Sequence, residues 1–216
     1  MTVPFDAIRA IHNAFRTDIA AIDEAANAAA HGKGGLNPVI QRYKFLNDIL
    51  VWHADGEEEF VFPAVEKVAP LISEPYEKDH RGLDSLYERL DKNVNAGDFV
   101  ETARSTAALS FHLNIHLDKE EAHLYRVFNE RIPIQEQGKI ASGMSQKIPP
   151  DRFPQTVGWL FPLVGIDDRE NLVRIWQQAM PAPVFTRAVG LIQTAISDDW
   201  GDLLQRVPEL GSAGKS

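Results

Sequence analysis

The segment FHLNIHLDKEEAHLYRVF, from Phe111 to Phe128, decides the fold. Its hydrophobic residues recur every three or four positions, which is the spacing of a helix with one buried face. On that face His116 and Glu120 stand four residues apart, so their side chains point the same way about one turn apart. Because burying an unpaired carboxylate costs several kcal/mol, the segment predicts a core helix with a polar site.

Helical spacing extends outward from this segment over nearly the whole chain. Strand alternation and Asn-Gly hairpin signals are missing, and prolines and glycines mark the helix ends. Long helices joined by short connections predict an all-α protein, an up-down-up-down four-helix bundle. The helices expected for the bundle span residues 4–30, 38–68, 74–95 and 98–131.

The chain changes character after Pro133, where the predicted helices become shorter. They cover about 134–148, a stretch around Trp159, then 168–180, 183–197 and 199–207. We therefore expect a bundle domain over residues 1–132 and a helical extension over 133–216 that packs on it. The last residues, GSAGKS, are expected to be a frayed terminus.

Each predicted bundle helix has a histidine on its apolar stripe, and two of the helices also have a glutamate there. A lone core histidine is usually neutral and bonded to a carbonyl, and a metal-free polar network is the alternative here. None of the four stripes contains an arginine or lysine, however, so a metal is the better partner for the buried carboxylates. The polar stripe positions are His12, His53, Glu57, His80, His116 and Glu120.

These six positions converge roughly on one layer of an antiparallel bundle. Six nitrogen and oxygen donors exceed what one tetrahedral zinc ion needs and suit two metals bridged by two carboxylates. The chain has no cysteine, which excludes disulfides, zinc–thiolate sites, iron–sulfur clusters and thiol nucleophiles. Mn and Zn accept the same ligands as Fe, so the metal itself is left open.

The charge balance argues against two kinds of partner. Lys and Arg number 22 and Asp and Glu 31, a net charge of −9, which opposes binding to nucleic acid or anionic membranes. The N-terminal residues lack the pattern of a signal peptide, and no apolar run approaches the ~18 residues of a membrane span. We therefore expect a soluble, cytoplasmic protein.

These residues resemble the hemerythrin-like, or HHE cation-binding, family, including longer bacterial members with C-terminal extensions. The family pattern is a histidine on helix one, H-x-x-x-E on helix two, a histidine on helix three and H-x-x-x-E on helix four. The matching residues are His12, HADGE from His53 to Glu57, His80 in KDHRGLD, and HLDKE from His116 to Glu120. The resemblance covers about residues 5–131.

The resemblance implies a non-haem centre of two Fe ions with a bridging oxo or hydroxo group. The four histidines would be terminal ligands, and Glu57 and Glu120 would bridge the metals. Oxygen-carrying hemerythrins have a second histidine four residues after the helix-three histidine, where this chain has Asp84. That difference makes simple reversible oxygen carriage less favoured than oxidative or peroxide chemistry.

Several neighbouring residues are weighed as further ligands or as partners of ligands. Asp84, His112 and His123 are candidates for either role, although the two histidines are expected more often than not to miss the metal. Glu58 and Glu59 are expected in solvent.

The leading functional hypothesis is binding or reduction of a small oxidant, meaning dioxygen, hydrogen peroxide or nitric oxide. If the protein is an enzyme, it would be a di-iron oxidoreductase of the peroxidase, catalase or oxygenase kind. One alternative is a di-iron oxygenase or oxidase that acts on an organic substrate. Another is an iron or oxygen sensor that acts through a partner protein not identified by the sequence.

Overall fold

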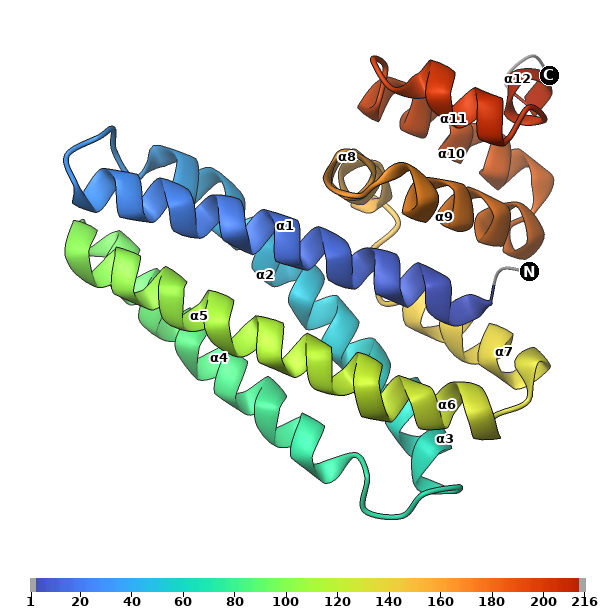
Figure 1. The fold of residues 1–216 in the computed structure, drawn as a ribbon, viewed down its shortest axis with the longest axis horizontal. Helices are drawn as coiled ribbons and strands as arrows, with labels where there is room; N and C mark the ends of the chain where they lie inside the picture. The colour runs from blue at the N-terminus through green and yellow to red at the C-terminus, as the bar shows by residue number, and fades with distance from the viewer. Residues whose placement is uncertain (1–2, 214–216) are drawn as a thin grey trace. The chain divides into compact units, whose positions relative to one another are not determined.

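Helices joined by turns make up residues 3–213, the part that the computed structural model describes, and this part contains no strand (Figure 1). The predicted all-α class is confirmed. The elements are α1 (Pro4–Ala30), α2 (Asn37–Gly56), the π-helix η1 (Glu57–Val61), α3 (Phe62–Glu66), α4 (Glu74–Asn95), α5 (Phe99–Lys119), the π-helix η2 (Glu120–Leu124), α6 (Tyr125–Arg131), α7 (Ile134–Ser145), α8 (Phe153–Leu163), α9 (Ile166–Ala179), α10 (Ala182–Ala195), α11 (Trp200–Arg206) and α12 (Leu210–Ala213).

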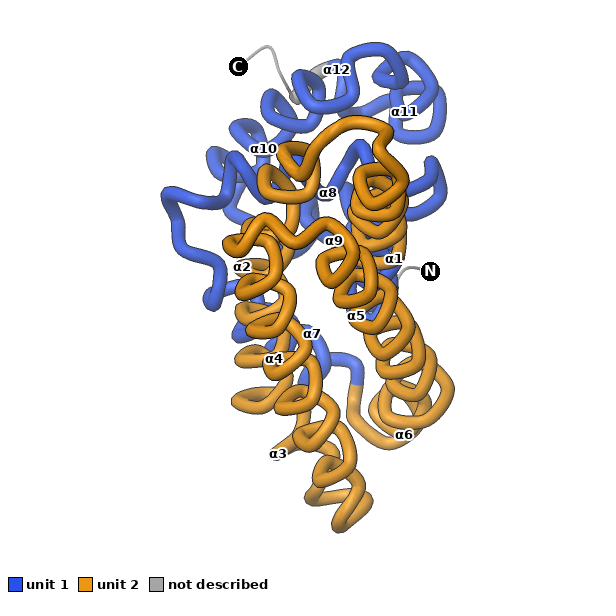
Figure 2. The backbone as a smooth tube through the Cα atoms, turned by 90° about the vertical axis from the view of Figure 1, so that its left-hand side faces the viewer, with its two compact units in different colours: residues 1–14, 134–216 blue, residues 15–133 orange. Residues whose placement is uncertain are grey.

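The chain forms two compact units, shown in different colours in Figure 2. One unit contains residues 15–133, and the other contains residues 1–14 with 134–216. The expected division into 1–132 and 133–216 stays a prediction; in contrast to it, the grouping by contacts divides α1 after Ala14. Of the expected frayed terminus, residues 211–213 belong to α12 and residues 214–216 lie outside the described part.

In the unit of residues 15–133 the helices lie in the cyclic order α1, α2, α4, α5, as the predicted bundle requires. Successive helices run in alternate directions (Figure 1). Each neighbouring pair is joined by a polar contact. These contacts are Arg42 Nε to Asp18 at 2.8 Å, Tyr43 to Asp91 at 2.7 Å, Asn93 to Ser105 at 2.8 Å and Thr106 to Asp23 at 2.6 Å.

Two of the predicted helices are interrupted where the sequence analysis expected continuous α-helix. The helical stretches expected over 38–68 and 98–131 contain the π-helices η1 and η2, and each begins at the glutamate of an H-x-x-x-E motif. A π-turn spans i to i+5 and so takes up one extra residue, which moves the buried stripe along by one position. In an unbroken α-helix the stripe would continue from Glu57 to Phe60 and from Glu120 to His123. Instead Val61 and Leu124 are fully buried, Phe60 is half-buried and His123 is exposed.

The other unit has an apolar core of its own. Ala10 and Ala14 of α1 belong to it, together with residues of α8, α9 and α10 such as Phe161. Asn13 on the same helix donates to Asp168 at 2.8 Å. The first turns of α1 therefore contribute packing and a hydrogen bond to the unit that contains the C-terminal helices.

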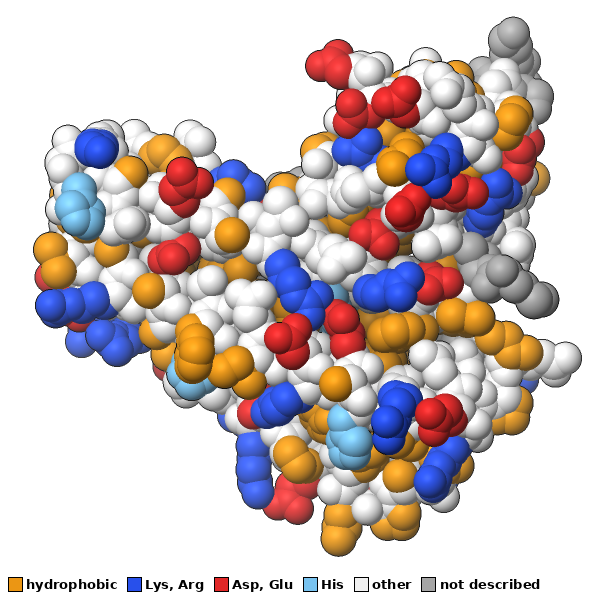
Figure 3. All heavy atoms as spheres, in the orientation of Figure 1, with side chains coloured by type: hydrophobic (Ala, Val, Ile, Leu, Met, Phe, Trp, Pro, Cys, Tyr) orange, Lys and Arg blue, Asp and Glu red, His pale blue; other side chains and the backbone are white. Residues whose placement is uncertain are grey.

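The surface is charged but mixed in sign. On the face in Figure 3, acidic and basic side chains are interspersed, and neither sign forms a continuous area. Within residues 3–213, no helix combines the length and the apolar character needed to cross a bilayer.

Candidate metal centre

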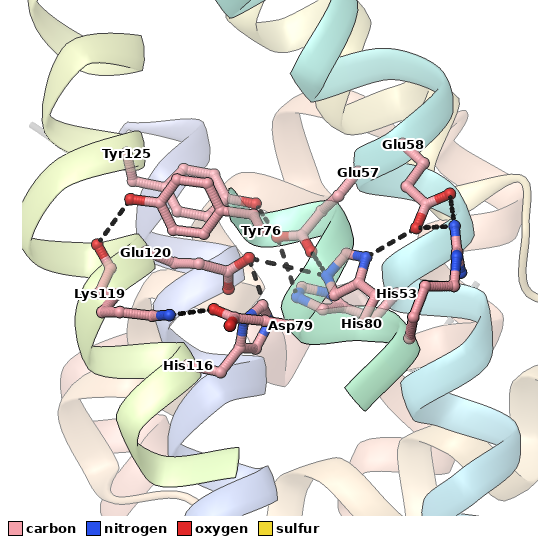
Figure 4. A network of polar contacts seen from close by, with 11 residues as sticks. His53, Glu57, Glu58, Tyr76, Asp79, His80, His116, Lys119, Glu120 and Tyr125 are labelled. Carbon is pink, nitrogen blue, oxygen red and sulfur yellow. Dashed lines mark hydrogen bonds and ion pairs between the residues drawn. The ribbon is translucent and has the colours of Figure 1, made fainter. Parts of the chain in front are cut away.

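Four of the predicted ligands meet inside the unit of residues 15–133. Glu57, His80, His116 and Glu120 are all buried, and each offers one donor atom within 4.8 Å of the others. Figure 4 shows their side chains converging from η1, α4, α5 and η2. The structure thus brings together residues from three stretches of the chain that are far apart in the sequence.

The histidine rings direct their Nε2 atoms at the two carboxylates. His53 Nε2 lies 3.2 Å from Glu57 Oε1, and His116 Nε2 lies 3.2 Å from Glu120 Oε1. His80 Nε2 lies 3.4 Å from Glu57 Oε2 and 3.9 Å from Glu120 Oε1. The donor set is therefore imidazole nitrogen and carboxylate oxygen, which suits iron, manganese or zinc.

The electrostatics of the centre call for added positive charge. Burial and then the negative charge of Glu57 raise the pKa of Glu120 well above its ordinary value. Burial also acts to raise the pKa of Glu57, but the charge of His53 and the short contacts of the His53 and His80 rings with its carboxylate outweigh burial and hold that pKa well below its ordinary value. Burial lowers the pKa of His116 to about 4. Glu57 and Glu120 each have a donor atom within 4.8 Å of the other. Without a cation, the two carboxylates are not both ionised, because like charges so close together repel each other.

A cation also fits the atoms that lack hydrogen bonds. Glu57 Oε2 and His80 Nε2 are buried and have no hydrogen-bond partner among the described residues. Buried polar atoms normally have such a partner, and an exception needs an explanation such as an ion. The residues present therefore fit a metal ion bound by imidazole nitrogens and carboxylate oxygens, and their role as ligands remains a prediction.

Two carboxylates outside the donor cluster orient its histidines. Glu58 accepts a hydrogen bond from His80 Nδ1 at 2.9 Å, and Asp79 Oδ2 lies 3.5 Å from His116 Nδ1. A carboxylate only accepts, so the proton on His80 is placed at Nδ1 and the Nε2 lone pair is left for the centre. The expectation that Glu58 is a solvent residue is wrong, because Glu58 is partly buried between His80 and Arg81.

Tyr125 is a further buried member of the site that the sequence analysis missed. Its hydroxyl donates to Glu57 Oε1 at 2.5 Å, and its side chain is fully buried. Burial, and next the charges of Glu57 and Glu120, raise the pKa of Tyr125 well above its ordinary value, so the phenol keeps its proton. An α-helical stripe leads from Glu120 to His123 and Val127; only the π-turn brings Tyr125 inward.

His12 occupies a buried position on α1. It lies three residues before Phe15, so the two side chains share a face of the helix. The ring of Phe15 meets the ring of His53 edge-on, with centroids 5.4 Å apart. His12 belongs to the unit of residues 1–14 and 134–216. The support for its role as a ligand is its buried position on α1, and that role remains a prediction.

The other candidate ligands lie outside the cluster of buried donors. Asp84 is exposed and pairs with Arg81 at 3.6 Å. His112 is exposed beside Phe111, and His123 is exposed with its Nδ1 3.0 Å from the hydroxyl of Tyr76. Of the three candidates, His123 is linked to the donor cluster through one side chain, because its partner Tyr76 packs edge-on against His116.

A cavity of about 240 Å³ adjoins the centre between α2, α4 and α5. It reaches the rings of His53, His80 and His116, and much of its remaining wall is leucine.

Together, the helical bundle and its buried His/Glu cluster define a helical metal-binding protein. The family model described as "Hemerythrin HHE cation binding domain" matches residues 3–128, and the chain belongs to this family. No solved structure matches the chain significantly.

The chain is also similar to parts of three much larger plant proteins from Arabidopsis thaliana. It is 24% identical to "Zinc finger protein BRUTUS" over 79% of the chain and 14% of that protein. It is 25% identical to "Zinc finger protein BRUTUS-like At1g18910" over 84% of the chain and 16% of that protein, and 24% identical to "Zinc finger protein BRUTUS-like At1g74770" over 84% and 17%. The chain thus spans less than a fifth of the length of these relatives, and it has no cysteine for a zinc–thiolate site.

Proposed function

We propose that the protein is a non-haem di-iron protein that binds or reduces a small oxidant: dioxygen, hydrogen peroxide or nitric oxide. The observation that carries the proposal is the cluster of Glu57, His80, His116 and Glu120, buried and within 4.8 Å of one another. Membership of a cation-binding family supports the same conclusion.

In this proposal the two irons are held by six side chains. His12, His53, His80 and His116 are the terminal ligands, and Glu57 and Glu120 are the bridges. When bound, the irons supply the exchange of electrons with the oxidant that no side chain of this chain supplies by itself.

The surrounding residues prepare the ligands for this task. Glu58 and Asp79 hold the rings of His80 and His116, and Tyr125 holds one oxygen of Glu57. Such outer partners fix the tautomer and direction of a ligand and commonly change metal affinity by about 10–100-fold when they are removed. Leucines form the apolar part of the cavity wall beside the rings.

The test is the metal content and visible spectrum of the full chain, purified in air, before and after addition of peroxide. We expect about two irons per chain, as in di-iron bundles, with near-UV absorption from ferric iron. Bleaching or oxygen evolution after peroxide would support peroxide removal. Zinc alone, or no metal, would contradict the proposal.

A second candidate function is oxidation of an organic substrate at the same centre. The cavity of about 240 Å³ favours it, since a diatomic oxidant needs far less space. Two irons per chain with no response to peroxide would shift the balance toward this candidate.

A further inference from the structure

We infer that the cavity between α2, α4 and α5 binds a small organic molecule, apolar in its body and either neutral or positively charged, beside the metal centre. The proximity of this ligand to metals rests on the proposed function, whereas its binding rests on the cavity alone.

The size of the cavity sets the size of the ligand. Its volume is about 240 Å³. A water molecule takes about 30 Å³ of liquid, and an engineered apolar cavity of about 150 Å³ in another protein holds benzene. This cavity therefore exceeds the need of dioxygen or nitric oxide and accommodates one aromatic ring with a short substituent.

The inner wall is apolar and well packed. Leu109, Leu113 and Leu117 of α5 are exposed by 1% or less, and Leu50 and Leu83 cover the cavity from α2 and α4. Burying apolar surface of a ligand against such a wall is favourable by roughly 25 cal/mol per Å². The body of the ligand is therefore expected to be a hydrocarbon ring or chain.

The charged residues that line the cavity set the sign of the polar group. They are three carboxylates and one guanidinium, Asp55, Glu58, Asp84 and Arg81. The guanidinium is already engaged, because Arg81 donates to Glu58 at 2.6 Å and lies 3.6 Å from Asp84. In the metal-free chain an anionic ligand would meet the net negative charge of these four side chains, whereas an ammonium or hydroxyl group is accepted.

Asp84 explains why the cavity is open at this point. It stands four residues after His80 on α4, and its side chain is 57% exposed. Its carboxylate lies 3.6 Å from Arg81, so the short side chain is engaged at the surface, which leaves space in the cavity for a ligand.

The experiment is a calorimetric titration of the purified full chain with benzylamine, benzyl alcohol and benzoate, which share one ring and differ in charge. We expect benzylamine and benzyl alcohol to bind once per chain. Benzoate is compared in the chelated chain, where no metal ion attracts its carboxylate, and it should bind at least about tenfold more weakly than benzylamine because of the net negative charge of the lining. Failure of all three probes to bind, or benzoate as tight as benzylamine in the chelated chain, would overturn the inference.

Two variants locate the binding. Leu83→Phe places extra volume in the half-buried wall and should weaken all bound probes at least about tenfold. Asp84→Asn should weaken the binding of benzylamine alone. The control Glu88→Gln removes a carboxylate one turn further along the exposed side of α4 and should leave the affinity for every probe unchanged. Unchanged affinities in both Leu83→Phe and Asp84→Asn would place the probes elsewhere and contradict the inference.

A second titration after chelation separates this inference from the proposed function. Binding of benzylamine and benzyl alcohol should persist without metal, since the wall and the lining carboxylates remain. Loss of benzylamine binding alone on chelation would mean that the amine coordinates a metal, which would contradict a cavity site. Iron content, measured separately, decides the proposed function.

Discussion

The segments His53–Phe62 and His116–Tyr125 lie on different helices of the bundle and share one local design. Each has a histidine and a glutamate four residues apart, each changes from α- to π-helix at that glutamate, and each has an aromatic residue five positions beyond it. The repeated π-turn directs each aromatic residue toward the interior, where Phe62 and Tyr125 are both buried.

The two segments differ in what they contribute around the donors. Phe62 stacks on the ring of His80 at 5.6 Å between centroids, whereas Tyr125 donates a hydrogen bond to Glu57. Glu58 holds His80, while the matching Glu121 pairs with Arg16 at 2.8 Å. One backbone design, used twice, therefore produces an asymmetric centre, because the side chains around the donors differ between the two segments.

The largest expected effect comes from removing what the two segments share. If the proposed di-iron centre is correct, Glu57→Ala and Glu120→Ala should each lower iron from about two per chain to well below that, because each would remove a proposed bridging carboxylate. Elemental analysis of the purified full chains measures it, with Glu88→Gln as a surface control. Retention of two irons in both variants would contradict the bridging roles.

Loss of the carboxylate that follows the motif glutamate should affect metal affinity in the first segment and not in the second. Glu58→Gln should weaken metal binding by about 10–100-fold, because it replaces the charged carboxylate that accepts from His80 Nδ1 with a neutral amide. Glu121→Gln should leave metal affinity close to that of the unaltered protein, since Glu121 pairs with Arg16 instead of a predicted ligand. Competition with a chelator measures both affinities, and equal losses would mean that the second layer is symmetric.

Exchange of the aromatic residues tests the same asymmetry through stability. Tyr125→Phe removes a donor to buried Glu57, and Phe62→Tyr buries a hydroxyl next to the His80 ring. Each should lower the free energy of unfolding by about 1–3 kcal/mol, the usual cost of an unsatisfied buried polar group. Urea denaturation of the metal-free chains measures it. Phe60→Tyr is the matched control, because Phe60 is half-buried and its added hydroxyl should cost less than about 0.5 kcal/mol.

The smallest effect is expected where the first segment leads into its loop. Glu66 accepts from the backbone N–H groups of Ser73 and Leu71, each at 2.8 Å, and the matching position after the second segment is Asn129. The backbone hydrogen bond from Ser73, and next its hydroxyl, lower the pKa of Glu66 below its ordinary value of 4.5. A lowered pKa in the folded state stabilises above the ordinary pKa and loses that effect as pH falls through the folded value.

The thermal midpoint of Glu66→Gln relative to the unaltered protein should therefore be slightly lower at neutral pH. The difference should shrink as the pH falls below 4.5. A difference that stays constant over this range would show that the charge of Glu66 contributes nothing.

Much of the fold could be read from the chain because local signals are strong. The predicted first helix, 4–30, and third helix, 74–95, have the same bounds as α1 and α4, since prolines, glycines and a continuous apolar stripe mark their ends. His53 and Glu57, and likewise His116 and Glu120, lie side by side as expected, because residues four apart on one helix share a face.

Each feature that the sequence did not predict has a physical cause. An extra residue in a π-turn leaves no signature in an α-helical stripe, so the inward position of Tyr125 was not predictable from spacing. Glu58 stands beside Glu59 in an acidic run that resembles a solvated face, and only the approach of α4 places His80 and Arg81 against it. The grouping of residues 1–14 with the C-terminal helices depends on contacts between distant parts of the chain.

By itself, the sequence determined the helical class, the ends of α1 and α4, and the pairing of His53 with Glu57 and of His116 with Glu120, because these depend on neighbours within a turn or two. Only the tertiary structure decided which carboxylates orient the histidines, that Tyr125 reaches Glu57, and that a cavity lies beside His80. Those features require helices remote in sequence to meet at side-chain distances, and local spacing carries no information on that meeting.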